Sequence, residues 1–442
     1  MDRIIIEGVR CFYERQSAPL KPITLLTGEN STGKTTFLAM ARLAWDACKG
    51  RLPLDFNEEP FILGAYDQVA SYRGRRAGCV STFTIGAEIA RTGEGGNSQA
   101  RVTAVFANKE GQAALTTWAL EAKEIHARVS YGSAEATPCF TISSPSGPET
   151  SISLPASMSG LPVCDIFGDL YFSLVLKQTR RRGTQNRQGQ TSLSSLRELA
   201  QVGRQMVMLH GGFFQRLGSR PYAFAPIRSR PLRTFDAIRA VAEPEGSHVP
   251  SVLVGLAALH PAVWKKLRPT LSAFGEASGL FSDLNVRRMG DEESGPFQIQ
   301  VRISGSAFNL MDVGYGVSQV LPIVVDSLRS ERGSTFLLQQ PEIHLHPSAQ
   351  AELGSFLALL AKEHRKQFLI ETHSDYLVDR IRMEVRDGKV LKPEDVSLLY
   401  FERADGDVRI HSLEIDGMGN IVNPPKGYRR FFLEEEKRLL GG

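Results

Sequence analysis

The amino-acid sequence predicts an α/β protein in which a largely parallel, doubly wound sheet carries an antiparallel β arm and a helical insertion. Three observations predict this class. A glycine-rich motif, GENSTGKT, lies between an apolar strand and an amphipathic helix. Strand and helix patterns alternate along the chain from Phe297 onward. Residues 78–155 contain short β runs separated by Gly, Ser and Asn clusters, which is typical of an antiparallel sheet.

The predicted elements follow in chain order. Two strands, RIIIEGVRCF and PITLL, precede the glycine-rich motif, and a helix extends from the motif to about Cys48. The β arm comes next. From 192 to 285 the apolar spacing is mostly helical, with breaks at SRPYAFAPIRSRP and AEPEGSHVP. The remainder predicts the strand FQIQVRISG, a helix near 317–330, the strand TFLLQ, a helix from Pro347, the strand QFLIE, a helix from Ser374 and a hairpin that turns at Ala404 to Asp407.

Composition excludes few classes of protein. The chain has 442 residues, 42% of them apolar and 23% charged, and its net charge of +4 neither requires nor excludes a nucleic-acid partner. The five cysteines are scattered and contain no CxxC pair, which favours a reducing compartment. No apolar run approaches the roughly 18 residues of a membrane span. We therefore expect a cytoplasmic protein without a membrane partner.

The segment Gly28 to Thr35 fits the phosphate-loop pattern GxxxxGK[ST] at every fixed position. Gly28 and Gly33 let the backbone curl so that its N–H groups face phosphates, Lys34 supplies a positive charge, and Thr35 offers a hydroxyl to Mg²⁺. The alternative is a glycine-rich turn that only caps a helix. We expect ATP to contact Gly28, Glu29, Asn30, Ser31, Thr32, Gly33, Lys34, Thr35 and Thr36.

Several motifs in this order resemble the RecF/SMC-like, ABC-type ATPases of the OLD-related AAA group, which includes the ATPase subunits of Septu-like and PARIS-like antiphage systems. GENSTGKTT resembles their Walker A loop, MDVGYGVSQVLPIV their signature motif, FLLQQPEIHLHP their Walker B strand and IETHSDYLVDRI their switch-histidine segment. YAFAPIRSRP, PEGSHVP and the tail IDGMGNIVNPPKGYRRFF resemble three further family segments. The resemblance covers nearly the whole chain and implies an ABC-type P-loop NTPase head.

The resemblance also implies a division of the chain and a set of residue roles. Residues 1–175 would form an N-terminal ATPase lobe with the β arm, 176–285 a basic loop and the helical insertion, and 286–442 a C-terminal ATPase lobe. Gln339 lies where the family has its Mg²⁺-binding acid, Gln340 where it has its water-activating residue, and His373 at the switch histidine. Gly314, Gly316 and Ser318 match the signature turn, which in this family reaches the ATP of a second subunit.

Several residues in these motifs also have a simpler structural interpretation. Ser318 could cap the following helix, and Arg228 in YAFAPIRSRP could form a salt bridge at a domain boundary. His344 and His346 fit structural roles better than metal ligation, because HLH lacks the acid and the spacing of a zinc site. His373, between a strand and a helix, is better placed for a role at the nucleotide.

The two glutamines are the departure from the family that bears on chemistry. An amide offers an oxygen to water, but it lacks the charge that attracts Mg²⁺ and cannot accept a proton at neutral pH. The sequence therefore predicts ATP binding with weak or negligible hydrolysis, and leaves its status as an ATPase open. Two alternatives remain: Glu342 or Glu371 takes over the missing role, or a glutamine was introduced at 339 to trap the ATP-bound state.

As a function, the resemblance implies a nucleotide-gated sensor or scaffold in antiphage defence. ATP would join two copies into a homodimer or higher homo-oligomer, which controls a separately encoded effector, expected to be a nuclease. The alternative is a RecF-like DNA-repair or replication ATPase that clamps DNA, for which two basic clusters are candidates, Arg73, Arg75 and Arg76, and Arg180, Arg181, Arg182 and Arg187. A transporter subunit is disfavoured, because VGYGVSQ departs from the LSGGQ that such proteins carry.

Overall fold

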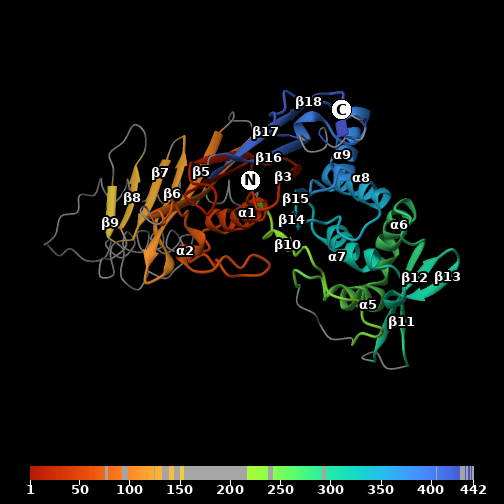
Figure 1. Cartoon of the computed structure of the whole chain (residues 1–442). Coiled ribbons are helices and arrows are strands. Elements are labelled where there is room, and N and C mark those ends of the chain that lie inside the picture. The colour runs from red at the N-terminus through yellow and green to blue at the C-terminus, as the bar shows by residue number, and fades with distance from the viewer. Residues whose placement is uncertain are drawn as a thin grey trace, which may run out of the picture. The chain divides into compact units, whose positions relative to one another are not determined.

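The computed structural model describes most of the chain, in two compact units (Figure 1). The described ranges are 1–74, 78–91, 98–123, 125–131, 139–143, 150–153, 217–236, 242–290, 295–404 and 406–428, with single residues of the C-terminal tail. One unit consists of residues 1–19, 39–220 and 403–409, and the other of 20–38, 221–402 and 410–442. We call them the arm unit and the nucleotide unit.

The nucleotide unit is organised by a seven-stranded sheet in the order β10-β14-β15-β3-β16-β17-β18. Parallel pairing joins β10 to β14, β14 to β15, β15 to β3 and β3 to β16. These central strands are apolar and buried on both faces, as parallel strands covered by helices usually are. The strand bounds are Ile23–Gly28 (β3), Tyr222–Phe224 (β10), Thr335–Gln339 (β14), Gln367–Glu371 (β15), Val396–Ala404 (β16), Asp407–Ile415 (β17) and Ile421–Val422 (β18).

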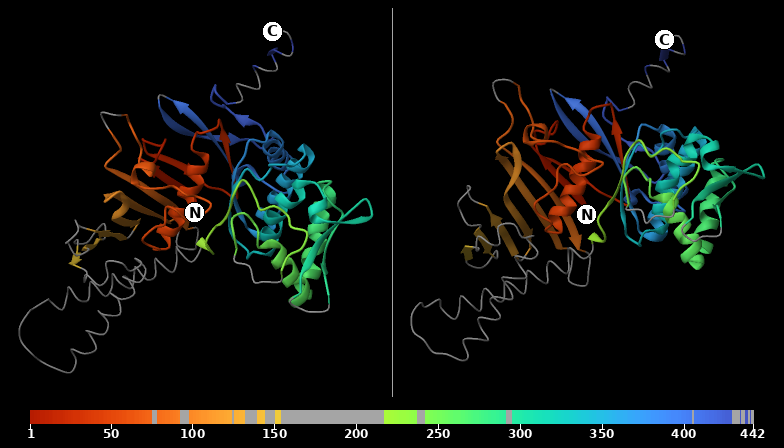
Figure 2. Two further views of the ribbon diagram at one scale, coloured as in Figure 1. Left: turned by 60° about the horizontal axis from the view of Figure 1, so that its bottom comes forward. Right: turned by 90° about the horizontal axis from the view of Figure 1, so that it is seen from below.

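Helices of the same unit, whose ribbons Figure 2 shows beside this sheet, share one apolar core with it. They are α5 (Val249–Leu259), α6 (Pro261–Ala277), α7 (Tyr315–Arg329), α8 (Pro347–His364) and α9 (Asp375–Asp387), with short 3-10 turns at Leu310–Asp312 (η4) and Pro393–Asp395 (η5). A three-stranded antiparallel sheet, β11 (Asp283–Arg288), β12 (Phe297–Ile303) and β13 (Ser306–Asn309), adds buried Leu284, Ile299 and Val301 to this core.

The arm unit is built on an eight-stranded sheet in the order β2-β1-β4-β5-β6-β7-β8-β9, with antiparallel pairing throughout. The bounds are Arg3–Glu7 (β1), Gln16–Pro19 (β2), Thr82–Arg91 (β4), Ser98–Lys109 (β5), Gln112–Ala122 (β6), Ile125–Ser130 (β7), Cys139–Ser143 (β8) and Thr150–Ser153 (β9), with a short helix α2 at Tyr66–Val69. The antiparallel arm predicted for 78–155 is confirmed.

The helix that follows the phosphate loop, α1 (Lys34–Cys48), enters the arm unit with its C-terminal part, where buried side chains hold it. The indole of Trp118, on β6, donates a hydrogen bond to the Ala47 carbonyl, 3.0 Å away. The indole of Trp45 donates to the Leu217 carbonyl at 3.1 Å. These bonds hold the C-terminal part of α1 within the arm unit.

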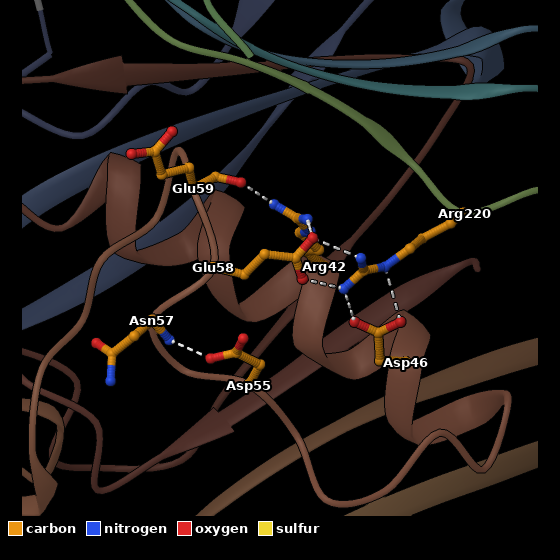
Figure 3. Close-up of polar contacts among 7 residues, drawn as sticks. All are labelled: Arg42, Asp46, Asp55, Asn57, Glu58, Glu59 and Arg220. Carbon is orange, nitrogen blue, oxygen red and sulfur yellow. Dashed lines mark hydrogen bonds and ion pairs between the residues drawn. The ribbon is translucent and has the colours of Figure 1, made fainter. Parts of the chain in front are cut away.

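An ionic cluster strengthens this anchor (Figure 3). Arg220 binds the Asp46 carboxylate through two nitrogens, at 3.0 and 2.6 Å, and also reaches Glu58. Arg42 donates to the Glu59 carbonyl at 2.6 Å and pairs with Glu58. Burial raises the pKa of Asp46, and the bonds from Arg220 offset part of that shift. The cluster ties Glu58, Glu59 and Arg220 to Arg42 and Asp46 of α1.

The structure adds to the parallel sheet an edge strand that the sequence did not predict. YAF within SRPYAFAPIRSRP was expected to interrupt a helical insertion, but Tyr222–Phe224 forms β10, at the edge of the parallel sheet. Three residues are too few for a periodic pattern, so the strand is defined by its pairing with β14.

The predicted β16–β17 hairpin is confirmed. Of the described cysteines, Cys48 alone is buried. No described helix is long and apolar enough to cross a membrane.

Candidate nucleotide site

The phosphate loop joins β3 to α1, and its backbone conformation requires glycine at two positions. Gly28 has φ +134°, and a Cβ there would lie 2.5 Å from the Phe401 carbonyl oxygen, so no other residue fits. Gly33 has φ +85°. Lys34 points into the loop and donates to the carbonyls of Gly28 and Glu29 at 3.0 and 2.6 Å. The loop is thus shaped to receive phosphate groups at the start of a helix.

The remaining loop residues support this shape or line its exposed tip. The Thr32 hydroxyl donates to the Glu29 carbonyl at 2.8 Å, which closes the loop from inside. Glu29, Asn30 and Ser31 are exposed, and Ser31 has φ +60°. Burial lowers the pKa of Lys34, while the charges of Glu371 and Glu29 act in the opposite direction. Thr36 is buried one residue into the helix from Thr35.

Glu371, at the end of β15, is the carboxylate that meets the phosphate loop. The Thr35 hydroxyl lies 3.0 Å from Oε1 and 2.8 Å from Oε2 of Glu371. Glu371 is 6% exposed, and burial raises its pKa, whereas the Thr35 bond and the Lys34 charge lower it. β15 pairs directly with β3, which explains why this residue reaches Thr35.

Gln339 and Gln340 lie farther from the loop. β14 is separated from β3 by β15, and the Gln339 amide donates to the Phe224 carbonyl at 3.3 Å, on β10 at the other side of β14. Gln340 follows with φ +42°, and its main-chain N–H donates to the Glu371 carbonyl at 2.8 Å. The roles assigned to both glutamines from the resemblance remain predictions.

Glu342 holds the loop that carries the switch histidine. Its Oε1 accepts hydrogen bonds from the Thr372 hydroxyl and from the His373 main-chain N–H, each at 2.8 Å. The Ser374 hydroxyl then caps α9 by accepting from Leu377 N–H at 3.0 Å. His373 itself is exposed, and partial desolvation, followed by the Lys34 charge, lowers its pKa. The switch loop is therefore fixed by the turn after β14.

The signature turn begins α7 beside the same turn. Gly314 is the N-cap residue of α7 and is exposed, whereas Gly316 is buried against the main chain of the turn after β14. The Ser318 hydroxyl lies inside the helix and donates to the Tyr315 carbonyl at 2.8 Å, so it does not cap α7. The Tyr315 ring packs edge-on against His344, and His346 caps α8 by accepting from Ser348 N–H. Both histidines thus have structural contacts.

Arg228 connects the signature helix to the end of β14. The side chain is 1% exposed and donates to the main-chain oxygens of Gln319 at 3.1 Å and Gln339 at 3.3 Å. Burial lowers its pKa to about 10, with the Glu342 charge opposing the shift. No carboxylate among the described residues forms an ion pair with it, so the salt bridge considered from the sequence is not formed. Its contacts are with the backbone.

The groups at this sheet edge fit a nucleotide with a hard divalent cation. The Thr35 hydroxyl and both Glu371 oxygens are the oxygen donors that Mg²⁺ prefers, and Lys34 supplies charge for phosphates. Glu342 is 7% exposed, and its second oxygen, Oε2, is buried without a hydrogen-bond partner in the described part of the chain. Loop amides and Lys34 would hold the phosphates, and the cation would supply charge neutralisation when bound.

Two functional contacts were not evident in the sequence. The sequence marked Glu371 only as one of two acids, with Glu342, that could replace the missing carboxylate. Its contact with Thr35 depends on the order of the strands. Gln319, whose Oε1 accepts from Arg228 N–H at 3.0 Å, lies next to the signature residues, and no local pattern marked it. A signal for Glu342 was present, since QPE follows a buried strand directly.

A phosphate loop on a parallel sheet with an acid from the neighbouring strand defines a mixed α/β P-loop nucleotide-binding fold. Residues 254–378 match the family model described as AAA ATPase domain, and residues 391–440 match a protein family of unknown function, DUF3696. The first match includes β14, Glu371 and His373, but the phosphate loop lies outside it. Residues 254–378 are therefore similar to an AAA ATPase domain. No curated protein matches this sequence.

Solved structures of SMC heads are similar to this chain at low sequence identity. The Smc head domain with an extended coiled coil, bound to the C-terminal domain of ScpA derived from Pyrococcus furiosus, is 10% identical, with 99% of each chain covered and a TM-score of 0.42. The SMC head domain from Thermotoga maritima is 11% identical, over 94% of this chain and 99% of that one, with a TM-score of 0.37. Since both scores are below 0.5, the fold rests on the strand order and the loop described above.

The two signature glycines should respond differently to the same substitution. In Gly316→Ala the new Cβ would lie 2.7 Å from the His344 carbonyl oxygen, so we expect a loss of about 1–3 kcal/mol of unfolding free energy, as overpacking usually costs. At Gly314, with φ −54° and open space where a Cβ would lie, alanine should cost only about 0.5 kcal/mol, the loss of a glycine cap. Urea denaturation measures both. Equal losses would contradict the close approach at Gly316.

Replacement of Glu342 should change how stability depends on pH. Burial raises the pKa of Glu342 in the folded protein above its ordinary value of 4.5, so the folded state holds the proton more tightly than the unfolded state. Stability is then full below the unfolded pKa and falls as pH rises toward the folded pKa, by at most about 1.4 kcal/mol for each pH unit between the two. The glutamine of Glu342→Gln does not titrate, so this variant lacks that loss of stability. The stability of the wild type relative to Glu342→Gln should therefore fall as pH rises from 4.5, and a difference that stays constant with pH would exclude the raised pKa.

Proposed function

We propose that this protein is an ATP-binding switch that acts as a dimer or higher homo-oligomer in antiphage defence and controls a separately encoded effector. One observation carries the nucleotide part: the Thr35 hydroxyl of the phosphate loop meets the Glu371 carboxylate at the carboxyl edge of a parallel sheet. Ligands of open α/β sheets bind at this edge. The AAA ATPase domain match at 254–378 supports the same conclusion.

Slow hydrolysis is the second part of the proposal. Phosphoryl transfer depends on charge neutralisation and on a group that orients the attacking water. Gln340 offers an amide at the position that the resemblance gives to this group, and an amide cannot take a proton at neutral pH. The Gln339 amide is engaged with the Phe224 carbonyl. We therefore propose that the protein binds ATP and hydrolyses it slowly.

A second subunit and an effector complete the proposal. The exposed Gly314 and Tyr315 at the start of α7 support it, because a signature turn that reaches another subunit's ATP must be accessible. The order of motifs, from GENSTGKT through VGYGVSQ to ETHSD, supports the defence role, since it resembles the ATPase subunits of antiphage systems. An effector of nuclease type is proposed as a partner on the same ground.

The DNA-clamp alternative draws less support from the described residues. Arg73, one of its candidate residues, lies 3.8 Å from the centre of the Tyr13 ring and 3.7 Å from an Asp407 oxygen. Asp407 also accepts hydrogen bonds from the main-chain N–H groups of Tyr13 and Glu14. Arg73 thus stabilises the arm unit internally. Arg75, Arg76, Arg180, Arg181, Arg182 and Arg187 lie outside the described residues.

Nucleotide binding, association and turnover test the first two parts together. We expect a fluorescent ATP analogue to bind the wild type and to shift it to a dimer or larger species in light scattering, with phosphate release close to that of Lys34→Ala. That variant should neither bind nor associate, because the loop loses its charge. Gln340→Glu should raise phosphate release by about tenfold or more, because it restores a group that can accept a proton. Rapid release by the unchanged chain would contradict slow hydrolysis.

Protection against phage tests the third part. The gene is expressed together with its immediate neighbours, and the efficiency of phage plating is compared with that of Lys34→Ala. We expect a fall of about tenfold or more in plating with the wild type only, because ATP binding gates the effector. If no phage in a broad panel is affected, and if the pure protein instead binds duplex DNA with an affinity that falls steeply with salt, the DNA-clamp alternative is favoured.

A further inference from the structure

We propose that Glu371 supplies the carboxylate that holds the divalent cation of the bound nucleotide, the role that the resemblance assigns to residue 339. This inference rests on the proposed function, because it presumes that ATP binds at the phosphate loop. It concerns the question that the two glutamines raise: how a site without the family's acid at 339 can still bind a nucleotide with its cation.

Strand order gives Glu371 its access to the loop. β15 lies between β14 and β3, with Glu371 paired to Gln339 on one side and to Leu26 on the other. β15 is the direct neighbour of β3, and Glu371 is its last residue. A carboxylate on β15 therefore reaches Thr35 directly, and both of its oxygens do so within 3.0 Å.

The Gln339 amide is engaged elsewhere. Its Nε2 donates to the Phe224 carbonyl on β10, on the side of β14 that faces away from β15 and β3. The main-chain oxygen of Gln339 accepts from Arg228 at 3.3 Å. Gln339 thus serves the packing of β10 against β14, and this leaves the Thr35 hydroxyl to Glu371.

Two buried carboxylates at the site would be stabilised by a bound cation. Glu371 and Glu342 are both buried, and the Glu342 charge raises the pKa of Glu371 further. Oε2 of Glu342 is one of the buried polar atoms without a hydrogen-bond partner in the described structure. Lys34 is near enough to act on Glu371, but it is also needed for phosphate. A divalent cation beside Thr35 would relieve the repulsion between two buried carboxylates.

Cation-dependent nucleotide affinity tests the proposal without any measurement of turnover. A fluorescent ATP analogue is titrated into the purified chain in EDTA and again with Mg²⁺, and Mn²⁺ binding in the presence of the nucleotide is followed by electron paramagnetic resonance. We expect Mg²⁺ to tighten binding to the wild type, and Glu371→Gln to lose about tenfold or more of that gain while its affinity in EDTA is kept or increased. Mn²⁺ binding should weaken in parallel.

Two further variants serve as controls for Glu371→Gln. Gln339→Leu removes the amide but should keep the Mg²⁺-dependent gain, and Glu363→Gln, an exposed position on α8 with the same change in charge, should leave both affinities unchanged. If Glu371→Gln keeps the gain, or if Gln339→Leu loses it, Glu371 does not hold the cation. Should Glu371→Gln fail to fold, Glu371→Asp decides: its shorter carboxylate should reduce the gain several-fold, and an unreduced gain overturns the proposal. Failure of the wild type to bind in either buffer would instead contradict the proposed function.

Discussion

The parallel pairing of β14, β15 and β3 is the constraint on which the site depends. Parallel strands end at the same edge of a sheet, so the residues that follow each of them must meet there. The phosphate loop follows β3, Glu371 ends β15, and Gln339 ends β14. Because β15 lies between the other two, its last residue contacts Thr35. Every other contact of the site is arranged around this edge.

Hydrogen bonds join three motifs at this edge into one unit. Glu342, in the turn after β14, binds the main chain of His373, and Arg228 binds the main chain of both Gln319 and Gln339. Gly316 allows α7 to approach His344 in the same turn. The turn after β14, the switch segment and the signature helix are therefore held together by contacts to the main chain. Such contacts are stiff, because a buried main-chain oxygen that loses its partner costs free energy.

The charges at the sheet edge support the proposed separation of nucleotide binding from hydrolysis. Holding a nucleotide needs the loop amides, Lys34 and a negative group for the cation, and all of these are present at the sheet edge. Cleavage needs in addition a group that orients or deprotonates water. A glutamine at 340 offers only an amide, and Oε1 of Glu342 is occupied with the switch loop. This division of groups is the basis of the proposed switch, whose proposed output is an assembly rather than a product.

The sequence by itself determined the class of fold and most of its elements. The alternation of TFLLQ, QFLIE and the helices that follow them predicts a parallel sheet, and the loop pattern identifies Lys34 and Thr35, because these features depend on local residue type and spacing. Only the tertiary structure decided which strand lies beside β3, that β10 extends the sheet, and that Glu371 meets Thr35 while the Gln339 amide turns to Phe224. Strand order is a long-range property, set by how crossover helices pack, and no local pattern encodes it.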